Sequence, residues 1–106
     1  MHGYMVTFFT HQGKRHKGKP LAEWLLGEAR ALGIRGATEI VAAEGFGHRG
    51  RLHSYHFFEL ANQPVEVVMA LKEDDLQRVF ARLRKENVHV FYVKEPVEFG
   101  VIGEPD

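Results

Sequence analysis

The stretch VEVVMAL, residues 65–71, is the strongest strand signal in the chain, because it combines β-branched and apolar residues over a short run. Three acidic residues follow at 73–75 and favour a helix start, where negative charge meets the positive end of the helix dipole. An apolar stripe at helical spacing continues this helix over 76–83, and Asn87 can end it. VHVFYV, residues 88–93, predicts another strand. This half of the chain is therefore a predicted strand–helix–strand unit.

The preceding half repeats this order. YMVTFFT, residues 4–10, is apolar, β-branched and aromatic, which predicts a strand. HQGKRHKGK, residues 11–19, has no periodicity and predicts a loop. Pro20 favours the first turn of a helix, whose apolar stripe recurs at steps of three and four until Gly33 can cap it. GATEIVAA, residues 36–43, then predicts a strand.

Shorter signals complete the pattern. YHFFEL, residues 55–60, predicts renewed strand, and residues 61–64 predict a turn or bulge before the strongest strand. Pro96 is expected to end the last main strand, and residues 97–102 are expected to form a short edge strand.

Two strand–helix–strand units in tandem predict an α+β fold, the ferredoxin-like βαββαβ sandwich, with an antiparallel sheet and both helices on one face. We expect a single domain over residues 1–106, with a core at about 4–93 and a C-terminal tail at 94–106. Strands such as 65–71 and 88–93 carry apolar groups on both sides. The sheet face away from the helices is therefore expected to be buried by self-association.

Composition excludes several classes of protein. The 106 residues include 44% hydrophobic and 26% charged residues, close to globular averages. Because there is no cysteine, neither a disulfide framework nor a thiolate zinc site can form. No signal peptide or membrane-length apolar run is visible, so we expect a cytoplasmic protein without membrane insertion. The formal net charge of zero argues against a general nucleic-acid binder.

Four segments resemble a known family: GKPL at 18–21, EARALGIRGAT at 28–38, EGFGHRGRLHS at 44–54 and PVEVVMAL at 64–71. They are similar to an uncharacterised bacterial and archaeal family described as P-II-like, after the nitrogen-regulatory P-II signalling proteins. The resemblance spans residues 4–93, and the GFG core followed by LHS is its most specific part. It implies a ferredoxin-like subunit in a homotrimer with the sheets facing inward.

P-II proteins bind adenine nucleotides in clefts between subunits and touch partner proteins through a long loop between the second and third strands. By position, residues 48–53 correspond to that loop, which is short here. P-II proteins also carry a glycine-rich phosphate loop after the second helix, where this chain has Lys85, Glu86 and Asn87. The resemblance therefore implies the architecture and the intersubunit cleft, and not the ATP site itself.

The segment EGFGHRGRLHS supplies chemistry suited to anions. Glycines allow positive φ and close approach of the backbone, and successive N–H groups in such a turn can form an anion-binding concavity. Arg49 and Arg51 add forked donors for phosphate or carboxylate. The alternative is a tight turn whose arginines are solvated or pair with acids across an interface. The candidate contacts from this segment are Gly45, Gly47, His48, Arg49, Arg51 and His53.

The second basic segment, residues 11–19, precedes a predicted helix N-terminus, where free N–H groups and the dipole favour anions. Lys14, Arg15, Lys17 and Lys19 would strengthen that preference. The alternative is a solvated charged loop.

Histidines and hydroxyls give weaker signals. His53 and His56 are three residues apart, which places them on opposite faces of an extended strand, so their spacing does not favour a metal site. Ser54 is the one serine and lacks the GxSxG elbow of a nucleophile. We therefore predict no catalytic residue, no metal and no cofactor.

The leading hypothesis is a regulatory protein, not an enzyme. It would be a homotrimer that binds an anionic small molecule, a nucleotide or another phosphate or carboxylate, between subunits. Residues 45–53 could then present an altered surface to a partner protein. The alternatives are a small enzyme that uses the histidine-rich loop, with or without a metal, and, less favoured, a nucleic-acid binder that uses both basic segments.

Overall fold

The computed structural model describes residues 1–42, 44–46, 52–54 and 63–105. Its main elements follow the order strand, helix, strand, strand, helix, strand. They are β1 (His2–His11), α1 (Leu21–Ala31), β4 (Thr38–Val41), β7 (Pro64–Leu71), α2 (Glu73–Lys85) and β8 (Phe91–Glu98). Two small hairpins add β2 (Arg15–His16) with β3 (Lys19–Pro20), and β5 (Glu44–Phe46) with β6 (Leu52–Ser54).

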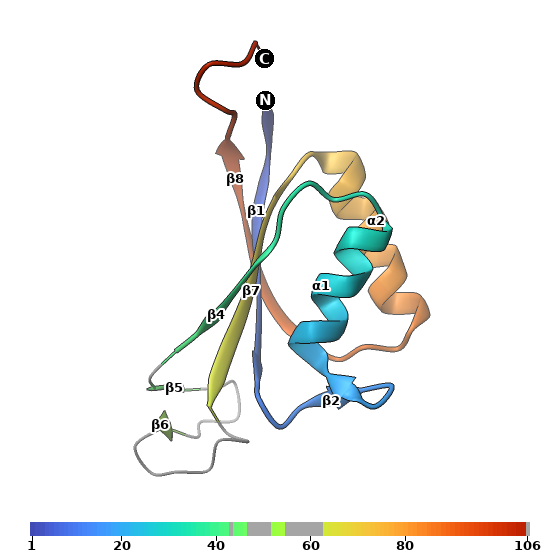
Figure 1. Ribbon diagram of the computed structural model, residues 1–106, viewed down its shortest axis with the longest axis vertical. Coiled ribbons are helices and arrows are strands. Elements are labelled where there is room, and N and C mark those ends of the chain that lie inside the picture. Colours follow the sequence, from blue (N-terminus) through green and yellow to red (C-terminus); the bar gives the residue numbers. More distant parts are fainter. Residues whose placement is uncertain (43, 47–51, 55–62, 106) are drawn as a thin grey trace.

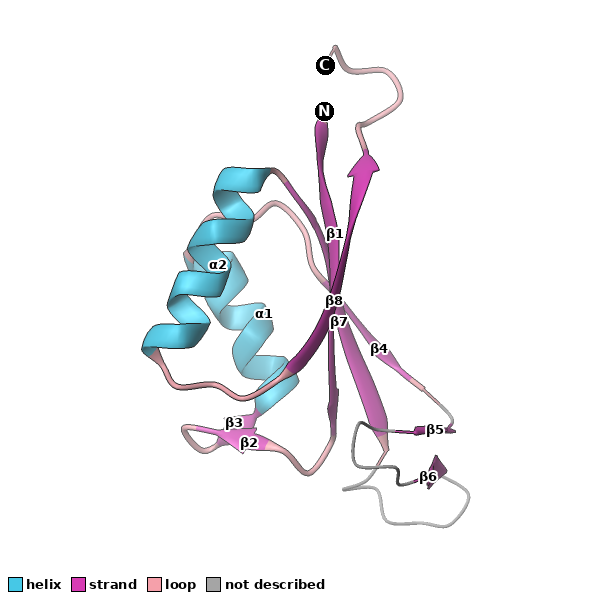
Figure 2. Cartoon of the chain, turned by 180° about the vertical axis from the view of Figure 1, so that it is seen from behind, coloured by secondary structure: helices cyan, strands magenta, loops and turns pink. Residues whose placement is uncertain are grey.

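The four main strands form one antiparallel sheet in the order β4-β7-β1-β8. Both helices cover the same face of this sheet, and no other described element covers the opposite face (Figure 1). Seen from behind, α1 and α2 again lie on one side of the strands (Figure 2). The predicted α+β, ferredoxin-like βαββαβ fold is confirmed.

The core lies between the sheet and the helices. On β1, Val6 and Phe8 are completely buried, and they lie opposite Met69 and Val67 of β7, which are at most 1% exposed. Strict alternation along both strands places these four side chains on the helix-covered face. The helices contribute the buried residues Leu21, Ala22, Trp24, Leu25, Ala29, Leu76, Val79, Phe80 and Leu83. The predicted apolar stripes are thus the core-facing sides of both helices.

Both helices end in the same way. Gly33 and Asn87 adopt positive φ values of 80° and 55° directly after the C-caps of α1 and α2. The following residues, Ile34 and Val88, donate their N–H groups back to the helices, to the carbonyls of Ala29 and Leu83, and pack against the core. This is the Schellman motif, so the predicted stops at Gly33 and Asn87 are confirmed.

Residues 11–19 differ from the predicted loop, because they contain the β2–β3 hairpin. Its two central residues, Lys17 and Gly18, have φ values of 51° and 80°. Positive φ at both central positions is typical of two-residue hairpin turns, because it matches the twist of the flanking strands. Lysine adopts this conformation less readily than glycine or asparagine, so the sequence carries no clear turn signal here.

The last strand also differs from its prediction. β8 begins at Phe91, since Val88 is used to close α2, and it continues through Pro96 to Glu98. The prediction that Pro96 ends the strand is wrong, as is a separate strand over 97–102. In the described sheet β8 has one partner, β1, and a proline fits an edge strand because alternate N–H groups point away from the partner. Residues 94–98 are therefore part of the sheet.

Two other predictions fall in the central region. The strand expected at 36–43 is shorter, Thr38–Val41. The strand expected at 55–60 lies outside the described residues. Within the stretch 44–54, β5 and β6 pair as antiparallel strands, with Gly45 opposite His53.

The sheet face away from the helices, the open face, is largely apolar, although the register also places Glu66 and Glu95 on it. Phe9 of β1 is 38% exposed and lies opposite Phe91 of β8, which is 51% exposed, with ring centroids 5.6 Å apart. Strand register places further apolar side chains on this face: Met5, Ile40, Val68, Ala70, Val93 and Val97. The prediction of apolar groups on both sides of the strands is confirmed; burial by self-association stays a prediction.

Candidate anion-binding site

Both basic segments leave the same edge of the sheet. β1 and β4 each run antiparallel to β7, so they are parallel to one another and their C-terminal ends lie at one edge. β1 leads from that edge into the β2–β3 hairpin, and β4 leads toward β5 (Figure 1). β7 lies between them, so the two exit points are about 10 Å apart at the usual strand spacing.

The four predicted cations of residues 11–19 lie on the β2–β3 hairpin or directly before it. The guanidinium of Arg15 donates to the carbonyl of Gly18 at 2.6 Å, which holds the turn closed from within. The carbonyl of Lys14 accepts the N–H of Leu21 at 2.8 Å, which fixes the hairpin to the first residue of α1. The side chains of Arg15 and Lys19 are on exposed residues. The hairpin is therefore a positioned element that displays cations beside the start of α1.

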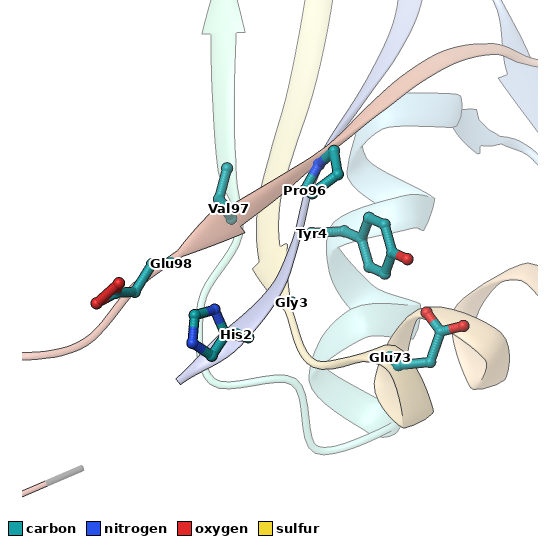
Figure 3. Close-up of a pocket in the computed structure, with 7 residues that line it drawn as sticks. All are labelled: His2, Gly3, Tyr4, Glu73, Pro96, Val97 and Glu98. Carbon is teal, nitrogen blue, oxygen red and sulfur yellow. The ribbon is translucent and has the colours of Figure 1, made fainter.

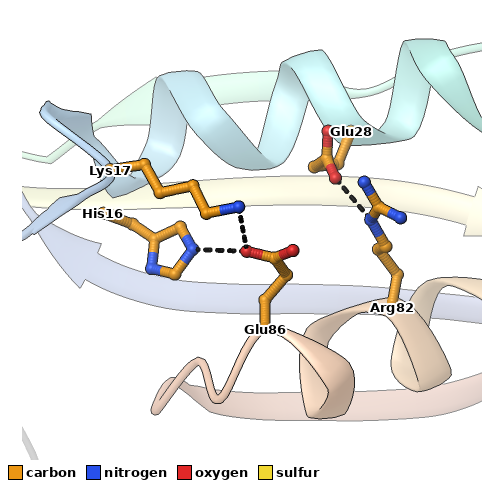
Figure 4. A network of polar contacts seen from close by, with 5 residues as sticks. All are labelled: His16, Lys17, Glu28, Arg82 and Glu86. Atoms are coloured by element: carbon orange, nitrogen blue, oxygen red, sulfur yellow. Dashed lines mark hydrogen bonds and ion pairs between the residues drawn. The ribbon is translucent and has the colours of Figure 1, made fainter.

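Glu86, at the C-cap of α2, anchors this hairpin (Figure 4). One carboxylate oxygen, Oε1, accepts the ammonium of Lys17 at 2.8 Å and Nε2 of His16 at 3.2 Å. The Glu86 side chain is 13% exposed, whereas that of Lys17 is 64% exposed. The hydrogen bonds from Lys17 and His16 lower the pKa of the Glu86 carboxyl below its ordinary value.

His16 is held on a second side by Trp24 of α1. The two rings meet edge to face with centroids 4.3 Å apart, and the indole is almost fully buried. The imidazole therefore links the hairpin to both helices, to α1 through Trp24 and to α2 through Glu86. Its position is set by packing as well as by charge.

A further ion pair joins the two helices next to Glu86. Arg82 of α2 donates through Nε to the carboxylate of Glu28 on α1 at 2.6 Å (Figure 4). That hydrogen bond raises the pKa of Arg82 above its already high ordinary value. Arg82 lies four residues before Glu86, so both charges lie on one side of the helix end.

The structure thus shows where the four predicted cations of residues 11–19 lie. Lys17 contacts Glu86, and the ammonium of Lys14 donates to the carbonyl of His89. Arg15 and Lys19 are both exposed, but the register, with Arg15 opposite Pro20 and Lys19 opposite His16, places them on different faces of the hairpin. The hairpin brings all four together, with two of them directed toward the end of α2.

Sequence reasoning missed the roles of Glu86 and His16. The sequence places Glu86 only in the connection after the second helix. A signal was present: a carboxylate at a helix C-terminus faces the negative end of the dipole, where a cation is favoured. An acid at that position implies compensating cations from elsewhere in the fold.

The second basic segment is described in part. Gly45 of β5 and His53 of β6 are paired in the register of these two strands. Gly47, His48, Arg49 and Arg51 lie outside the described residues. Contact between this segment and the β2–β3 hairpin therefore stays a prediction.

A shallow depression lies at the opposite edge of the sheet, where β1 begins and β8 ends (Figure 3). Its polar lining includes the carboxylates of Glu73 and Glu98 together with His2. Two carboxylates repel an anion, so this depression does not suit the predicted ligand class. Across the described part of the chain, no three metal-ligating side chains come together.

The described residues contain no helix that is long and apolar enough to span a membrane.

Comparisons with known proteins identify a family and a shared fold. The family model DUF190, described as an uncharacterised group, matches residues 3–99. A UPF0166 protein of Aquifex aeolicus (strain VF5) is 27% identical over 81 residues, covering 76% of this chain and 77% of the relative.

Solved structures share the fold. A candidate PII-like signaling protein from Thermus thermophilus has a TM-score of 0.67 at 21% identity, covering 92% of this chain and 88% of the other. CPII, a nitrogen regulatory PII-like protein from Thiomonas intermedia K12 bound to ADP, AMP and bicarbonate, has a TM-score of 0.66 at 14% identity, covering 95% and 91%. The fold is that of PII-like proteins, and the match over residues 3–99 shows that the chain belongs to the DUF190 family.

Proposed function

We propose that this protein is a PII-like regulatory protein, a homotrimer that binds an anionic small molecule in the clefts between its subunits. The observation that carries the proposal is the single sheet edge from which both basic segments leave. The CPII structure from Thiomonas intermedia K12, which has the same fold, contains ADP, AMP and bicarbonate, all of which are anions.

The open face supports self-association. Phe9, Ile40, Phe91 and Val93 are each between 38% and 51% exposed on it in the single chain. Exposed apolar surface of this kind marks an interface in soluble proteins, and Glu66 and Glu95 are the acidic residues that share this face. Packing open faces together around a threefold axis would bury these side chains and place sheet edges of neighbouring subunits close together.

The ligand would be held by cations and backbone donors of both segments. The proposed contacts are Lys14, Arg15, Lys17, Lys19, Gly45, Gly47, His48, Arg49, Arg51 and His53. Guanidinium and ammonium groups suit phosphate and carboxylate oxygens, and glycine N–H groups can approach them closely. Binding would change the surface that residues 45–53 present, and a partner protein could read that change.

Isothermal titration calorimetry tests this proposal, with ADP, AMP, bicarbonate, phosphate and pyrophosphate as probes and the mass in solution measured in parallel. We expect trimer mass and saturable binding of at least one probe. The double variant Arg15→Ala/Lys19→Ala should weaken that binding about tenfold or more, because it removes two exposed cations of the hairpin.

The matched control is Lys72→Ala, which removes an exposed cation at the opposite edge of the sheet and should leave binding unchanged. A folded protein that binds none of the probes, or that is monomeric at micromolar concentration, would contradict the proposal.

A further inference from the structure

We propose that Glu86 is a built-in competitor for the anion site, and that it restricts binding at the β2–β3 hairpin to ligands with two or more negative charges. This inference rests on the proposed function, since it concerns regulation of the same site. The ligand class is polyanions such as diphosphates, and Glu86 is the residue that sets this class.

The contacts of Glu86 are those of a bound anion. Its Oε1 accepts the ammonium of Lys17 at 2.8 Å and the imidazole of His16 at 3.2 Å, and both donors come from the hairpin that carries the candidate site. The carboxylate is 13% exposed, and the lysine that it engages is 64% exposed. Lys17 is therefore reachable from solvent while its charge is already partly neutralised.

A tethered carboxylate competes at a high effective concentration, in the millimolar range or above for a short connection. A monoanion that replaces Glu86 exchanges one single-charge contact for another and loses binding entropy, so its net gain is small. A polyanion can contact Lys17 and also reach Lys19, which is exposed and lies opposite His16 in the hairpin register. Competition with Glu86 therefore favours ligands that carry more than one negative charge.

The structure also offers a position for the displaced carboxylate. Arg82 lies one helical turn before Glu86 on α2, and its charge already acts on the Glu86 carboxyl. Its guanidinium contacts Glu28 through Nε, and the side chain is 40% exposed. Glu86 can thus turn from the hairpin toward Arg82. In the described chain, Lys17 and His16 act on the Glu86 carboxyl through hydrogen bonds, and Arg82 acts on it through its charge.

Displacement has a mechanical consequence. The Glu86 contacts and the Lys14 contact with the His89 carbonyl hold the hairpin against the end of α2. A ligand that takes over Lys17 and His16 releases one of these two attachments. Occupancy of the site is thereby linked to the position of the hairpin relative to α2.

The test compares Glu86→Gln with wild type by calorimetry, using pyrophosphate as the polyanion and acetate as the monoanion. Wild type should bind pyrophosphate at least about a hundredfold more tightly than acetate, because only pyrophosphate can outcompete the tethered carboxylate of Glu86. In Glu86→Gln the affinity for acetate should rise about three- to tenfold, and the affinity for pyrophosphate should rise less. The ratio of the two affinities should therefore be smaller than in wild type. Glu98→Gln, at the opposite sheet edge, is the matched control and should leave both affinities unchanged.

A direct readout in the unmodified protein covers the case in which Glu86→Gln does not fold. Carbon-detected NMR titration reports the pKa of the Glu86 carboxyl. This pKa should rise toward its ordinary value when pyrophosphate saturates the site, because Lys17 and His16 are withdrawn from the carboxylate.

The outcomes separate the two proposals. If wild type binds pyrophosphate while folded Glu86→Gln shows equal or weaker binding of both probes, or if the Glu86 pKa is unmoved at saturation, the competitor role is wrong and the anion site stands. If wild type binds acetate as tightly as pyrophosphate, the charge selection is wrong. If neither protein binds any probe of the wider panel, the proposed function fails, and this inference with it.

Discussion

The two faces of the sheet are built from the same strands and the same kinds of side chain, and they differ in what covers them. Phe8 and Phe9 are neighbours on β1, yet Phe8 is fully buried under the helices and Phe9 is 38% exposed on the open face. The helix-covered face gains its stability within one chain. No described element covers the open face, which is why its apolar side chains favour association with another chain.

A second difference separates these faces. The covered face is closed at one end by charges, through the contacts of Glu86 with the hairpin and of Arg82 with Glu28. These groups are partly exposed at the rim, and the core beneath is wholly apolar among the described residues. The apolar core and the proposed anion site therefore occupy adjacent but distinct parts of the molecule, so single substitutions can test them separately.

The largest expected effect comes from the matched pair of phenylalanines. Phe8→Ala should lower the free energy of unfolding by about 3–5 kcal/mol, because it leaves a cavity in a close-packed core. Phe9→Ala should cost much less in a dissociated subunit, since its ring is partly solvated. Urea denaturation of both variants at low protein concentration measures the difference. Equal losses would show that the two faces are not energetically distinct.

The next effect concerns the open face. Val93→Glu places a charge opposite Thr7 and beside Phe91 and Glu95 on the open face, and should weaken self-association at least about a hundredfold while the subunit stays folded. Analytical ultracentrifugation and circular dichroism report the two properties. Lys94→Glu is the control, because Lys94 is the adjacent residue and its side chain lies on the other face of the sheet. Unchanged mass for Val93→Glu would remove the open face as the interface.

A smaller effect is expected at the end of α1. Gly33→Ala should cost about 1 kcal/mol, because alanine at a φ of 80° is strained and this residue turns Ile34 back onto the core. Gly36→Ala is the matched control, since a Cβ there meets open space and its φ is not in the left-handed region. Thermal denaturation compares the two. A loss confined to Gly36→Ala would contradict this account of the helix end.

The smallest effect is the pH dependence of the hairpin anchor. Because the pKa of the Glu86 carboxyl is lowered in the folded protein, its stabilising contribution is present above the unfolded pKa of about 4.3 and is lost as pH falls through the folded value. Wild type should be more stable than Glu86→Gln at pH 7, and the gap should close toward pH 3. Parallel melting curves measure this gap; a constant gap across that range would show that the charge of Glu86 does not stabilise the fold.

Much of the architecture could be predicted from residue patterns. The apolar stripes of α1 and α2, the strand at 65–71 and the stops at Gly33 and Asn87 are local signals, and each was found because neighbouring residues in sequence decide it. The hairpin at 15–20 and the passage of β8 through Pro96 were not predicted. Both depend on contacts with other strands and turns, which override the usual meaning of lysine and proline.

The sequence by itself determined the fold class, the two-sided apolar strands and the clustering of cations in two segments, because periodicity and composition act over short distances along the chain. Only the tertiary structure decided that both segments leave one edge of the sheet and that Glu86 lies against Lys17 and His16, about 70 residues earlier in the chain. Contacts at such separations follow from strand order and helix packing, which no local pattern of residues records.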